Sequence, residues 1–459
     1  MGVATTFVAR CFLATSSILT SADLPRRASL EGFVPRAALL LSLLLVLAPS
    51  ARAQAPGPDP ALAHARRLLQ STILIDGHND LPWAIRTYKD APMDVDAYDL
   101  NRKTPGMTDL PRLAAGLVGA QFWSIYVPGE YRDSGYARVQ LEEFDIARRM
   151  IARYPDRMAL ALTADDIVQA HKQHKIASLL GMEGGHAIEN SLGALRMYYA
   201  LGARYMTLTH NVTLDWADAA LDSARHNGLT PFGREVVREM NRLGMLVDLS
   251  HVSPAVMSNT LDVSEAPVIF SHSSARALVD YPRNVPDSIL ARLPANGGID
   301  MVTFVPSFVS RAVDSADRAT DSAIASLTQG VTDTAEQHRI AKEYRDTHPE
   351  PHATLADVAD HIEHVRKVAG IDHVGIGSDL DGIDFGPDGL EDVSKYPYLF
   401  AELIRRGWGD ADLKKLAGEN LLRVLRQAEA TAHRLQRERR PSTATIQQLD
   451  GPRTEAPKT

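Results

Sequence analysis

Cysteine is almost absent from this sequence of 459 residues, since the only one is Cys11, near the N-terminus. If that end is removed during export, the mature chain has neither a disulfide framework nor a thiol nucleophile. Basic residues are in deficit as well, because 49 Lys and Arg face 57 Asp and Glu and leave a net charge of -8. Without a basic stripe interleaved with aromatic residues, the sequence argues against a nucleic acid partner.

A long apolar run is also missing, because no segment reaches the roughly 20 apolar residues that span a bilayer. The longest run, Ala37–Leu47, follows Arg36 and precedes Ala51-Arg52-Ala53, which is the pattern of a signal peptide and its cleavage site. We therefore expect cleavage near Ala53 and a periplasmic or secreted protein. The C-terminal residues are polar, which argues against a permanent membrane anchor.

Composition divides the chain into four expected segments. Residues 1–53 are an N-terminal extension with the signal peptide, and the Pro-rich residues 54–66 indicate a linker. Residues 67–428 have the apolar content to bury one large core, so we expect a single catalytic domain there. Residues 429–459 are polar and contain proline, which predicts a disordered tail.

Eight short apolar or β-branched runs alternate with helical patterns in the expected domain. Between them, Thr230-Pro231 and Ser253-Pro254 each place proline after a helix N-cap residue, and the long connection over 305–370 is expected to hold two or three helices. The alternation predicts parallel βαβ units, and eight of them predict a (β/α)8 barrel of the TIM type. The predicted strands are Thr72–Ile75, Ala120–Val127, Ala177–Met182, Tyr205–Thr209, Met245–Leu249, Pro267–Ser271, Ile299–Phe304 and His373–Gly377.

Histidine or an acidic residue follows six of these eight strands. In such a barrel the loops after the strands form one rim, and the reacting groups gather there. Unrelated capping residues would be mostly Ser, Asn and Thr, so the pattern predicts a functional site. The polar groups are Asp76-Gly77-His78-Asn79-Asp80, Glu183-Gly184-Gly185, His210, Ser250-His251, His272 and Ser378-Asp379.

These residue types suit a metal centre. His78 and Asp80 alternate in an extended segment, so both can reach one ion, while His251 and His272 end neighbouring strands and can converge on a second. Glu183 can join the two halves, because a lone buried carboxylate there needs a cation to compensate it. With no cysteine, nitrogen and oxygen ligands favour zinc, with manganese or cobalt as substitutes. Five ligands over two ions leave open positions, which is typical of a catalytic site.

Seven short stretches occur together in this chain. They are Ile75-Asp76-Gly77-His78-Asn79-Asp80, Gln121-Phe122-Trp123-Ser124, Met182-Glu183-Gly184-Gly185-His186, Tyr205-Met206-Thr207-Leu208-Thr209-His210, Leu246-Val247-Asp248-Leu249-Ser250-His251, Arg283-Asn284-Val285-Pro286-Asp287 and Gly377-Ser378-Asp379-Leu380-Asp381-Gly382. This combination resembles the membrane dipeptidase family, also called renal dipeptidase, over residues 74–425. The resemblance implies a metallo-dependent hydrolase fold, a metallo-dipeptidase activity on dipeptides and a possible homodimer. The polar C-terminus departs from the membrane anchoring of animal members.

The resemblance also implies the metal arrangement. Two Zn2+ ions per chain are expected, one held by His78 and Asp80 and the other by His251 and His272. Glu183 is expected to bridge them. Dipeptides would then be hydrolysed by a hydroxide that bridges the two ions.

By the same resemblance, three further residues act on the substrate. His210 contacts the scissile carbonyl and stabilises the oxyanion together with zinc. Arg283 holds the substrate carboxylate in a bidentate fashion, which explains selection for short peptides. Asp379 lies near the free amine and is the candidate for protonating the leaving group. The catalytic set is therefore Glu183, His210 and Asp379.

Two alternatives stay open at this point. A related metal-dependent amidohydrolase could act on a lactam or another amide, since a metal site alone does not choose the bond that is broken. An exported protein could also bind peptides in the same pocket without turnover. Outside the metal set, His186 and Asp381 are assigned to turns, and helical histidines such as His361 are expected to be solvated.

Overall fold

The computed structural model describes residues 59–131 and 135–452. The predicted signal peptide and its cleavage near Ala53 lie outside these residues. Helix α1 (Pro60–Gln70) corrects the linker expected over residues 54–66. Asp59 caps this helix by accepting a hydrogen bond from the Ala61 N–H at 3.0 Å, and Pro60 stands in its first turn. The Pro-rich composition therefore marks a helix start instead of a linker.

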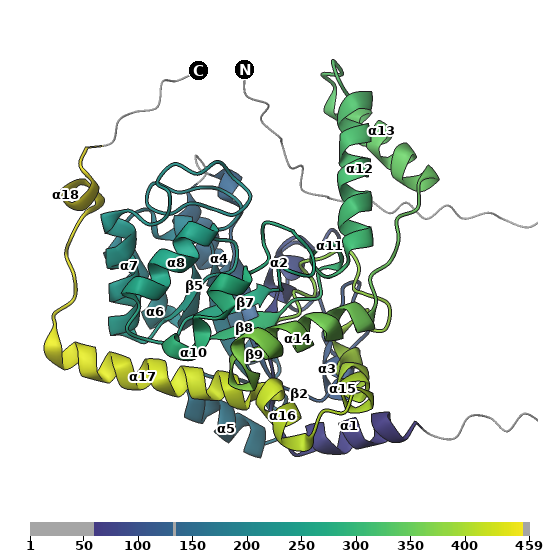
Figure 1. Cartoon of the computed structure of the whole chain (residues 1–459), viewed down its shortest axis with the longest axis horizontal. Helices are drawn as coiled ribbons and strands as arrows, with labels where there is room; N and C mark the ends of the chain where they lie inside the picture. Colours follow the sequence, from purple (N-terminus) through teal and green to yellow (C-terminus); the bar gives the residue numbers. More distant parts are fainter. Residues whose placement is uncertain (1–58, 132–134, 453–459) are drawn as a thin grey trace, which may run out of the picture. The chain divides into compact units, whose positions relative to one another are not determined.

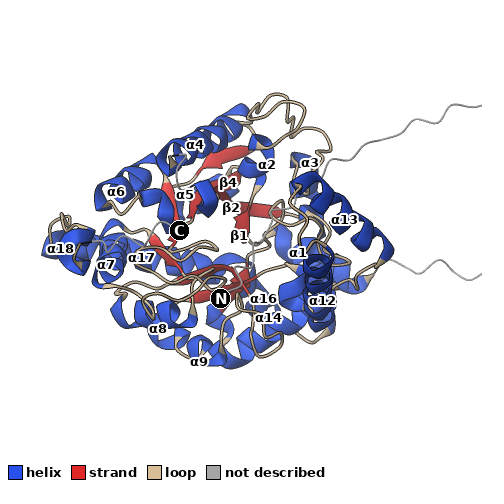
Figure 2. Cartoon of the chain, turned by 90° about the horizontal axis from the view of Figure 1, so that it is seen from above, coloured by secondary structure: helices blue, strands red, loops and turns tan. Residues whose placement is uncertain are grey.

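Eight parallel strands close into a barrel, which confirms the predicted (β/α)8 fold. The ring runs β1, β2, β4, β5, β6, β7, β8, β9 and back to β1, and β2 closes it by pairing with β4. With the labels of Figure 1, these strands are β1 Leu74–Asn79, β2 Val118–Tyr126, β4 Ile176–Glu183, β5 Ala203–Thr207, β6 Leu246–Asp248, β7 Ile269–Ser273, β8 Ile299–Val302 and β9 Val374–Ile376. Figure 2 shows the strands at the centre with the helices arranged around them.

The strand bounds differ by a few residues from the predicted ones, and two differences stand out. A further strand, β3 (Met158–Leu160), pairs with the first residues of β4 and stands outside the ring; only one of its three residues is buried, whereas the equally short β6 and β9 are buried throughout. Strand β1 runs on to Asn79 instead of ending at Ile75, so His78 belongs to the strand itself. All six residues of β1 are buried although several are polar, which departs from the apolar pattern of a buried strand.

The strands bury apolar side chains on both faces. Ile75 and Phe122 pack in the inner cluster with Tyr205, whereas Leu74 packs in the outer cluster against the helices. Neighbouring residues on opposite faces are the period-2 pattern of a strand. Inside the barrel, the Tyr205 ring lies against Gly181, where a Cβ would come 2.0 Å from the ring Cζ. Glycine is needed there because the tyrosine ring fills the space.

Helices cover the outside of the barrel. The two predicted proline starts are confirmed, because Thr230 accepts a hydrogen bond from the Gly233 N–H and Ser253 from the Val256 N–H. The helices are α2 Leu81–Arg86, α3 Leu110–Ala115, α4 Tyr136–Arg153, α5 Ala164–Lys172, α6 Leu192–Leu201, α7 Pro231–Leu243, α8 Pro254–Val263, α9 Asp287–Leu290, α10 Leu293–Asn296, α11 Pro306–Val309, α12 Arg311–Leu327, α13 Thr334–Thr347, α14 Leu355–Ala369, α15 Tyr396–Arg405, α16 Asp410–Lys414, α17 Asn420–Glu438 and α18 Ile446–Asp450.

The connection over 305–370 holds four helices, α11 to α14, where two or three were expected. Helix α11 is only one turn long, which explains why no pattern announced it. Helices α12 and α13 project away from the barrel in Figure 1, and α13 has no buried residue. Helix α14 packs back onto the barrel near β8 and β9.

The C-terminal residues correct the expectation of a disordered tail over 429–459. Helix α17 continues to Glu438, and α18 follows with a capping box between Thr445 and Gln448. The Asp450 carboxylate accepts hydrogen bonds from the start of α7, at 2.6 Å from Thr230 Oγ1 and 2.9 Å from the Phe232 N–H. Polar composition suggested disorder because these anchors lie more than two hundred residues away along the chain.

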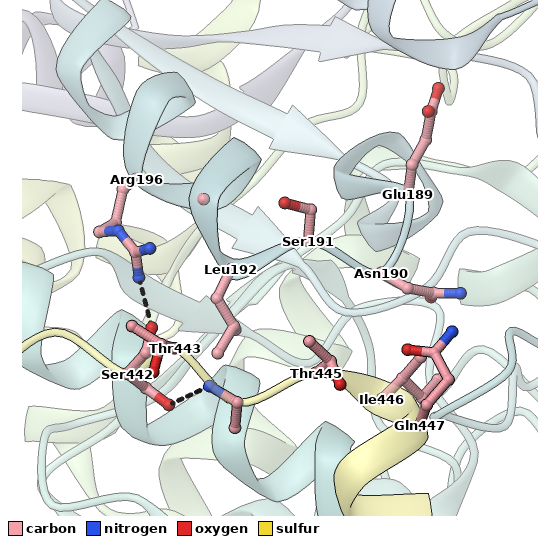
Figure 3. A pocket seen from close by; sticks show the side chains of 12 residues that line it. Glu189, Asn190, Ser191, Leu192, Arg196, Ser442, Thr443, Thr445, Ile446 and Gln447 are labelled. Carbon is pink, nitrogen blue, oxygen red and sulfur yellow. Dashed lines mark hydrogen bonds between the residues drawn. The ribbon is translucent and has the colours of Figure 1, made fainter. Parts of the chain in front are cut away.

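The segment that connects α17 to α18 also contacts α6. Figure 3 shows the pocket that it lines, where Arg196 donates to the Ser442 carbonyl at 2.9 Å. This pocket contains none of the predicted site residues. Within residues 59–131 and 135–452, none of the helices combines the length and the apolar character needed to cross a membrane.

Candidate metal centre

The barrel brings the predicted metal ligands and their neighbours to its C-terminal rim. Parallel strands end at the same edge, so residues far apart in the sequence meet there. His78 lies in β1 and Asp80 follows it, Glu183 ends β4, His210 follows β5, His251 follows β6, His272 lies in β7 and Asp379 follows β9. Arg283 lies in the loop after β7.

Glu183 stands between two groups of histidines. Its Oε1 lies 3.0 Å from His251 Nε2 and 3.6 Å from His272 Nε2, while its Oε2 lies 3.4 Å from His78 Nε2. Ser124 donates a hydrogen bond to Oε2 at 3.0 Å and fixes the carboxylate. The two oxygens therefore face different histidines, which is the geometry of a bridging carboxylate.

Other acids complete the cluster around His78. Its Nε2 lies 3.2 Å from Asp80 Oδ2 and 3.8 Å from Asp379 Oδ1. His210 joins from the opposite side, with Nε2 at 3.8 Å from Glu183 Oε1. Three overlapping groups could each hold a metal ion, with their ligand atoms within 4.8 Å of one another: His78, Glu183 and His272; Glu183, His210 and His251; His78, Asp80 and Asp379.

Each of three histidines engages an outer partner through Nδ1, which leaves Nε2 for the centre. Such partners fix the tautomer and the ring orientation of metal-binding histidines. The pairs are His78 with the Tyr205 hydroxyl at 2.8 Å, His251 with Asn211 Oδ1 at 3.0 Å, and His272 with Ser271 Oγ at 2.8 Å.

A buried carboxylate sets the tautomer of His272. The Ser271 hydroxyl donates to Asp248 Oδ2 at 2.6 Å, so its oxygen accepts from His272 Nδ1–H. Asp248 also accepts from Thr207 Oγ1 at 2.6 Å and from the Ser250 N–H at 3.1 Å. The hydroxyl has only one hydrogen, and that hydrogen is used by Asp248. His272 therefore presents a lone pair at Nε2.

Two such lone pairs face each other. His251 Nε2 and His272 Nε2 lie 2.9 Å apart, and the Asn211 oxygen gives His251 the same Nδ1–H tautomer. Burial lowers the pKa of both histidines well below the ordinary value, and the positive charge of Arg283 lowers it further. Two neutral nitrogens with facing lone pairs repel, so a shared cation suits this arrangement. The residues present therefore fit a divalent metal ion.

The acid at the centre keeps its charge. Burial raises the pKa of Glu183, but His78 and the other histidines outweigh it, so the pKa lies well below the ordinary value. Burial lowers the pKa of His78, but Tyr205 and the neighbouring acids raise it well above the ordinary value. An ionised carboxylate beside imidazole nitrogens is a donor set for a hard or borderline cation.

Arg283 is a buried cation in the same mouth. Its side chain is 1 % exposed, its Nη1 has no hydrogen-bond partner among the described residues, and its Nη2 reaches the His272 carbonyl only at 3.4 Å. Burial lowers its pKa to about 10, so it stays charged near neutral pH. The Phe308 ring centre lies 5.5 Å from the guanidinium carbon. A buried guanidinium with a free donor is suited to an anionic ligand.

Two of these residues have unusual backbones. His251 has φ 69° and Asp379 has φ 66°, in the left-handed region that side chains other than glycine seldom adopt. Strain of this kind collects at functional sites, where the surrounding structure holds it in place.

The outer partners were not identified from the sequence. Asp248 and Ser271 lie in predicted strands, where they were assigned to the fold, and Tyr205 was assigned to the start of a strand. Polar residues that interrupt an apolar strand are the signal that could have found them. Asn211, directly after His210, carried no such signal.

Three other predicted roles have mixed outcomes. His186 interacts with the Val127 carbonyl at 2.7 Å and Asp381 accepts from the Met107 N–H at 2.7 Å, so each binds the backbone of a distant segment, where ordering of a local turn was expected. His361 was expected to be solvated, and this was wrong. Its side chain is 1 % exposed because it faces the barrel side of α14.

Comparison with known proteins identifies the family to which this barrel is similar. Residues 62–439 match the model of the family described as membrane dipeptidase, peptidase family M19. Dipeptidase 3 of Rattus norvegicus is 43% identical over 378 residues, 81% of this chain and 68% of that protein. The crystal structure of the probable dipeptidase PvdM from Pseudomonas aeruginosa has a TM-score of 0.71 at 26% identity, covering 82% of this chain and 100% of that one. A metallo peptidase from Rhodobacter sphaeroides, liganded with a phosphinate mimic of L-Ala-D-Ala, has a TM-score of 0.64 at 25% identity, covering 78% of this chain and 99% of that one.

Proposed function

Since the chain belongs to the membrane dipeptidase family and is a metallo-dipeptidase, we propose that it hydrolyses dipeptides at a centre of two zinc ions in the barrel mouth. His78 and Asp80 would hold one ion, and His251 and His272 the other. Glu183 would bridge them, which its two oxygens support by facing different histidines. When bound, such ions lower the pKa of a bound water to near neutrality and polarise the scissile carbonyl.

Arg283 binds the C-terminal carboxylate of the substrate in this proposal. The guanidinium is buried and charged, and its Nη1 has no hydrogen-bond partner among the described residues, so an incoming carboxylate can pair with it. The cation lies close enough to the cluster to lower the pKa of His251 and His272. In this proposal, a peptide with its carboxylate on Arg283 extends across the centre by one further residue. The ligand of the Rhodobacter sphaeroides protein, a dipeptide mimic, supports the same substrate length.

His210 and Asp379 act on the reacting bond. His210 is 13 % exposed at its side chain and faces the cluster, so it can donate a hydrogen bond to the carbonyl oxygen as negative charge develops. Burial raises the pKa of Asp379 well above the ordinary value, although His78 opposes that shift. A carboxyl group whose pKa is raised holds its proton more strongly than an exposed acid and can pass it to the leaving amine. In its ionised form the same group attracts the free amine of the substrate.

Export is part of the same proposal. The run Ala37–Leu47 and the small residues that end at Ala53 support cleavage by a signal peptidase. N-terminal sequencing of the mature protein checks this step, and a first residue upstream of the apolar run would contradict it.

The unpaired guanidinium of Arg283 beside the histidine cluster carries the proposal and can be tested directly. Arg283→Ala should raise KM for dipeptides about 100-fold, because a buried charged hydrogen bond to the substrate is lost. Arg102→Ala is the matched control, since that arginine is 85 % exposed and should leave KM unchanged. Chelation should abolish turnover, and zinc should restore it.

Two results would overturn the proposal. An unchanged KM in Arg283→Ala would remove the carboxylate site. Intact dipeptide after incubation with the zinc-loaded protein would show binding without catalysis. A panel of L,L and L,D dipeptides, assayed before and after chelation, covers both cases.

A further inference from the structure

His361 is a buried histidine that has no contact with the metal cluster. It lies in α14, and both of its ring nitrogens interact with backbone groups of other segments. Nδ1 accepts a hydrogen bond from the Ala275 N–H at 3.0 Å, and Nε2 lies 3.2 Å from the Val309 carbonyl. Since Nδ1 is the acceptor, the proton is on Nε2, which donates to Val309. The ring is therefore a fixed bridge between two segments.

The first of these segments carries Arg283. Residues 274–285 leave β7 and fold back on themselves, because the Val285 N–H donates to the Ser274 carbonyl at 2.7 Å and the Arg276 N–H donates to the Val285 carbonyl at 3.0 Å. Ala275 lies at the base of this closed loop, beside the strand. A displacement of Ala275 therefore moves the base from which Arg283 extends.

The second segment covers Arg283. Val309 ends α11, and its neighbour Phe308 places its ring over the guanidinium. Asn284 makes a parallel link, since its Nδ2 donates to the Phe308 carbonyl at 2.8 Å. His361 and Asn284 thus attach consecutive carbonyls of α11 to the loop that carries Arg283. Among the described residues, the guanidinium Nη1 has no hydrogen-bond partner, and Nη2 reaches only the His272 carbonyl at 3.4 Å.

The His361 ring is held in its neutral form. Burial lowers the pKa of His361 to about 4, although its bond to Val309 opposes that shift. A neutral ring is required, because a second proton on Nδ1 would meet the Ala275 N–H. Near neutral pH the bridge is therefore constant.

We propose that His361 is a positioning residue for Arg283, which sets the place of the guanidinium and through it the affinity for the substrate carboxylate. The inference rests on the proposed function, in which Arg283 binds that carboxylate. His361 itself touches neither the substrate nor the metal ions. Its removal should weaken recognition of the carboxylate while the metal centre stays intact.

Three substitutions separate the two bonds of His361. Asparagine places an oxygen near the Nδ1 position and keeps the acceptor for Ala275, whereas glutamine places its amide near Nε2 and keeps the donor for Val309. Leucine removes both. His373 supplies a matched control, because this half-buried histidine also bonds a backbone carbonyl, that of Gly298 at 2.7 Å, away from the Arg283 loop.

The assay uses L-alanyl-L-alanine as substrate and its C-terminal amide as competitive inhibitor. His361→Leu and His361→Gln should raise KM for the dipeptide about tenfold, because small displacements of a binding group are amplified in this way. The inhibition constant of the amide, which lacks the carboxylate, should change less than twofold. His361→Asn should keep KM close to the wild-type value, because it retains the acceptor for Ala275. His373→Asn should change neither constant. Zinc content should remain two ions per chain in every variant.

Each contrary result has a defined meaning. Equal weakening of dipeptide and amide, or a fall in kcat with KM unchanged, would overturn the positioning role in favour of a general structural one. If His361→Leu does not fold, the contrast between asparagine and glutamine decides, and equal KM values for the two overturn the proposal. Arg283→Ala is measured alongside, so an unchanged KM there refutes the proposed function instead. A raised KM there with unaltered His361 variants refutes only the present inference.

Discussion

Replacement of Asp300 by asparagine should make this protein more stable at neutral and alkaline pH. Asp300 lies in β8, is fully buried and has no hydrogen-bond partner at either carboxylate oxygen among the described residues. Its paired neighbours across the sheet, Phe270 and Val374, belong to the outer apolar cluster. Burial without compensation raises the pKa of Asp300 to about 8. The acid is therefore mostly protonated in the folded protein at pH 7.

The sign of the effect follows from proton linkage. The unfolded chain releases this proton near the ordinary aspartate pKa of 3.8, whereas the folded chain keeps it until about pH 8. Between these two values the folded state binds more protons, so the free energy of unfolding falls as pH rises. At pH 7 the difference of roughly three units corresponds to about 4 kcal/mol, at 1.36 kcal/mol per unit. Above pH 8 this loss of stability is complete, and the contribution of Asp300 to the free energy of unfolding no longer changes with pH.

Asparagine has nearly the same shape but no charge to bury. We expect Asp300→Asn and the wild type to have similar stability near pH 4, where both side chains are neutral in the folded protein. The difference should grow steadily to a few kcal/mol at pH 8 in favour of the variant. Urea unfolding at five pH values between 4 and 9, followed by circular dichroism on the metal-loaded protein, measures it.

A second acid provides the control with the opposite sign. Burial raises the pKa of Asp218, but the N–H groups of Arg225, Gly228 and His226 outweigh it, so the pKa lies below the ordinary value. Asp218→Asn should therefore be less stable than the wild type by a constant amount above about pH 4, and this deficit should shrink as pH falls below that value, since an ionised acceptor is removed. If the free energy of unfolding of Asp300→Asn equals that of the wild type at every pH, the ionised carboxylate is stabilised by water or by a partner. The reasoning from burial is then refuted.

Three further changes have expected outcomes. Ser271→Ala should lower zinc affinity more than tenfold by releasing the His272 tautomer, as measured by competition with a chromophoric chelator; an unaltered affinity would contradict the relay through Asp248. Gly181→Ala should destabilise the protein by about 1–3 kcal/mol, because its Cβ would overlap the Tyr205 ring; an unchanged melting temperature would contradict this packing. Zinc at about 100 times its dissociation constant should stabilise the metal-free protein by about 2.7 kcal/mol, and chelation should reverse the shift in melting temperature.

Much of the barrel could be predicted because its signals are local. Apolar runs bounded by turns marked each strand of the ring, and Thr230-Pro231 marked a helix start by the chemistry of its own residues. Strand β3 was not predicted; only one of its three residues is buried, whereas the equally short β6 and β9 are buried throughout. The C-terminal helix α18 could not be found either, since Asp450 is anchored by Thr230, which lies 220 residues earlier in the chain. Composition alone suggested disorder where distant contacts supply the order.

The candidate centre was easier to predict than its surroundings. Histidine is rare at strand ends by chance, so His251 and His272 attracted attention without any structure. Their outer partners are a serine and an asparagine, residue types that occur everywhere, and only the folded chain brings Ser271 and Asn211 against the ring nitrogens. The identity of a metal ligand is thus visible in a sequence, whereas the hydrogen bond that orients it is not.

The burial of His361 could have been predicted from the sequence, but its hydrogen-bond partners could not. Its neighbours Asp360 and Glu363 in α14 suggested a solvated stretch, yet Val358 and Val365 lie three residues before it and four after it, on one face of the helix. Helical spacing could therefore have predicted that His361 is buried. It could not have predicted what the ring binds, because the partners are a backbone N–H 86 residues away and a backbone carbonyl 52 residues away. Every residue except proline offers both groups, so no side-chain pattern identifies the pairing. Recognition of the substrate carboxylate then depends on a contact that has no signature in the sequence.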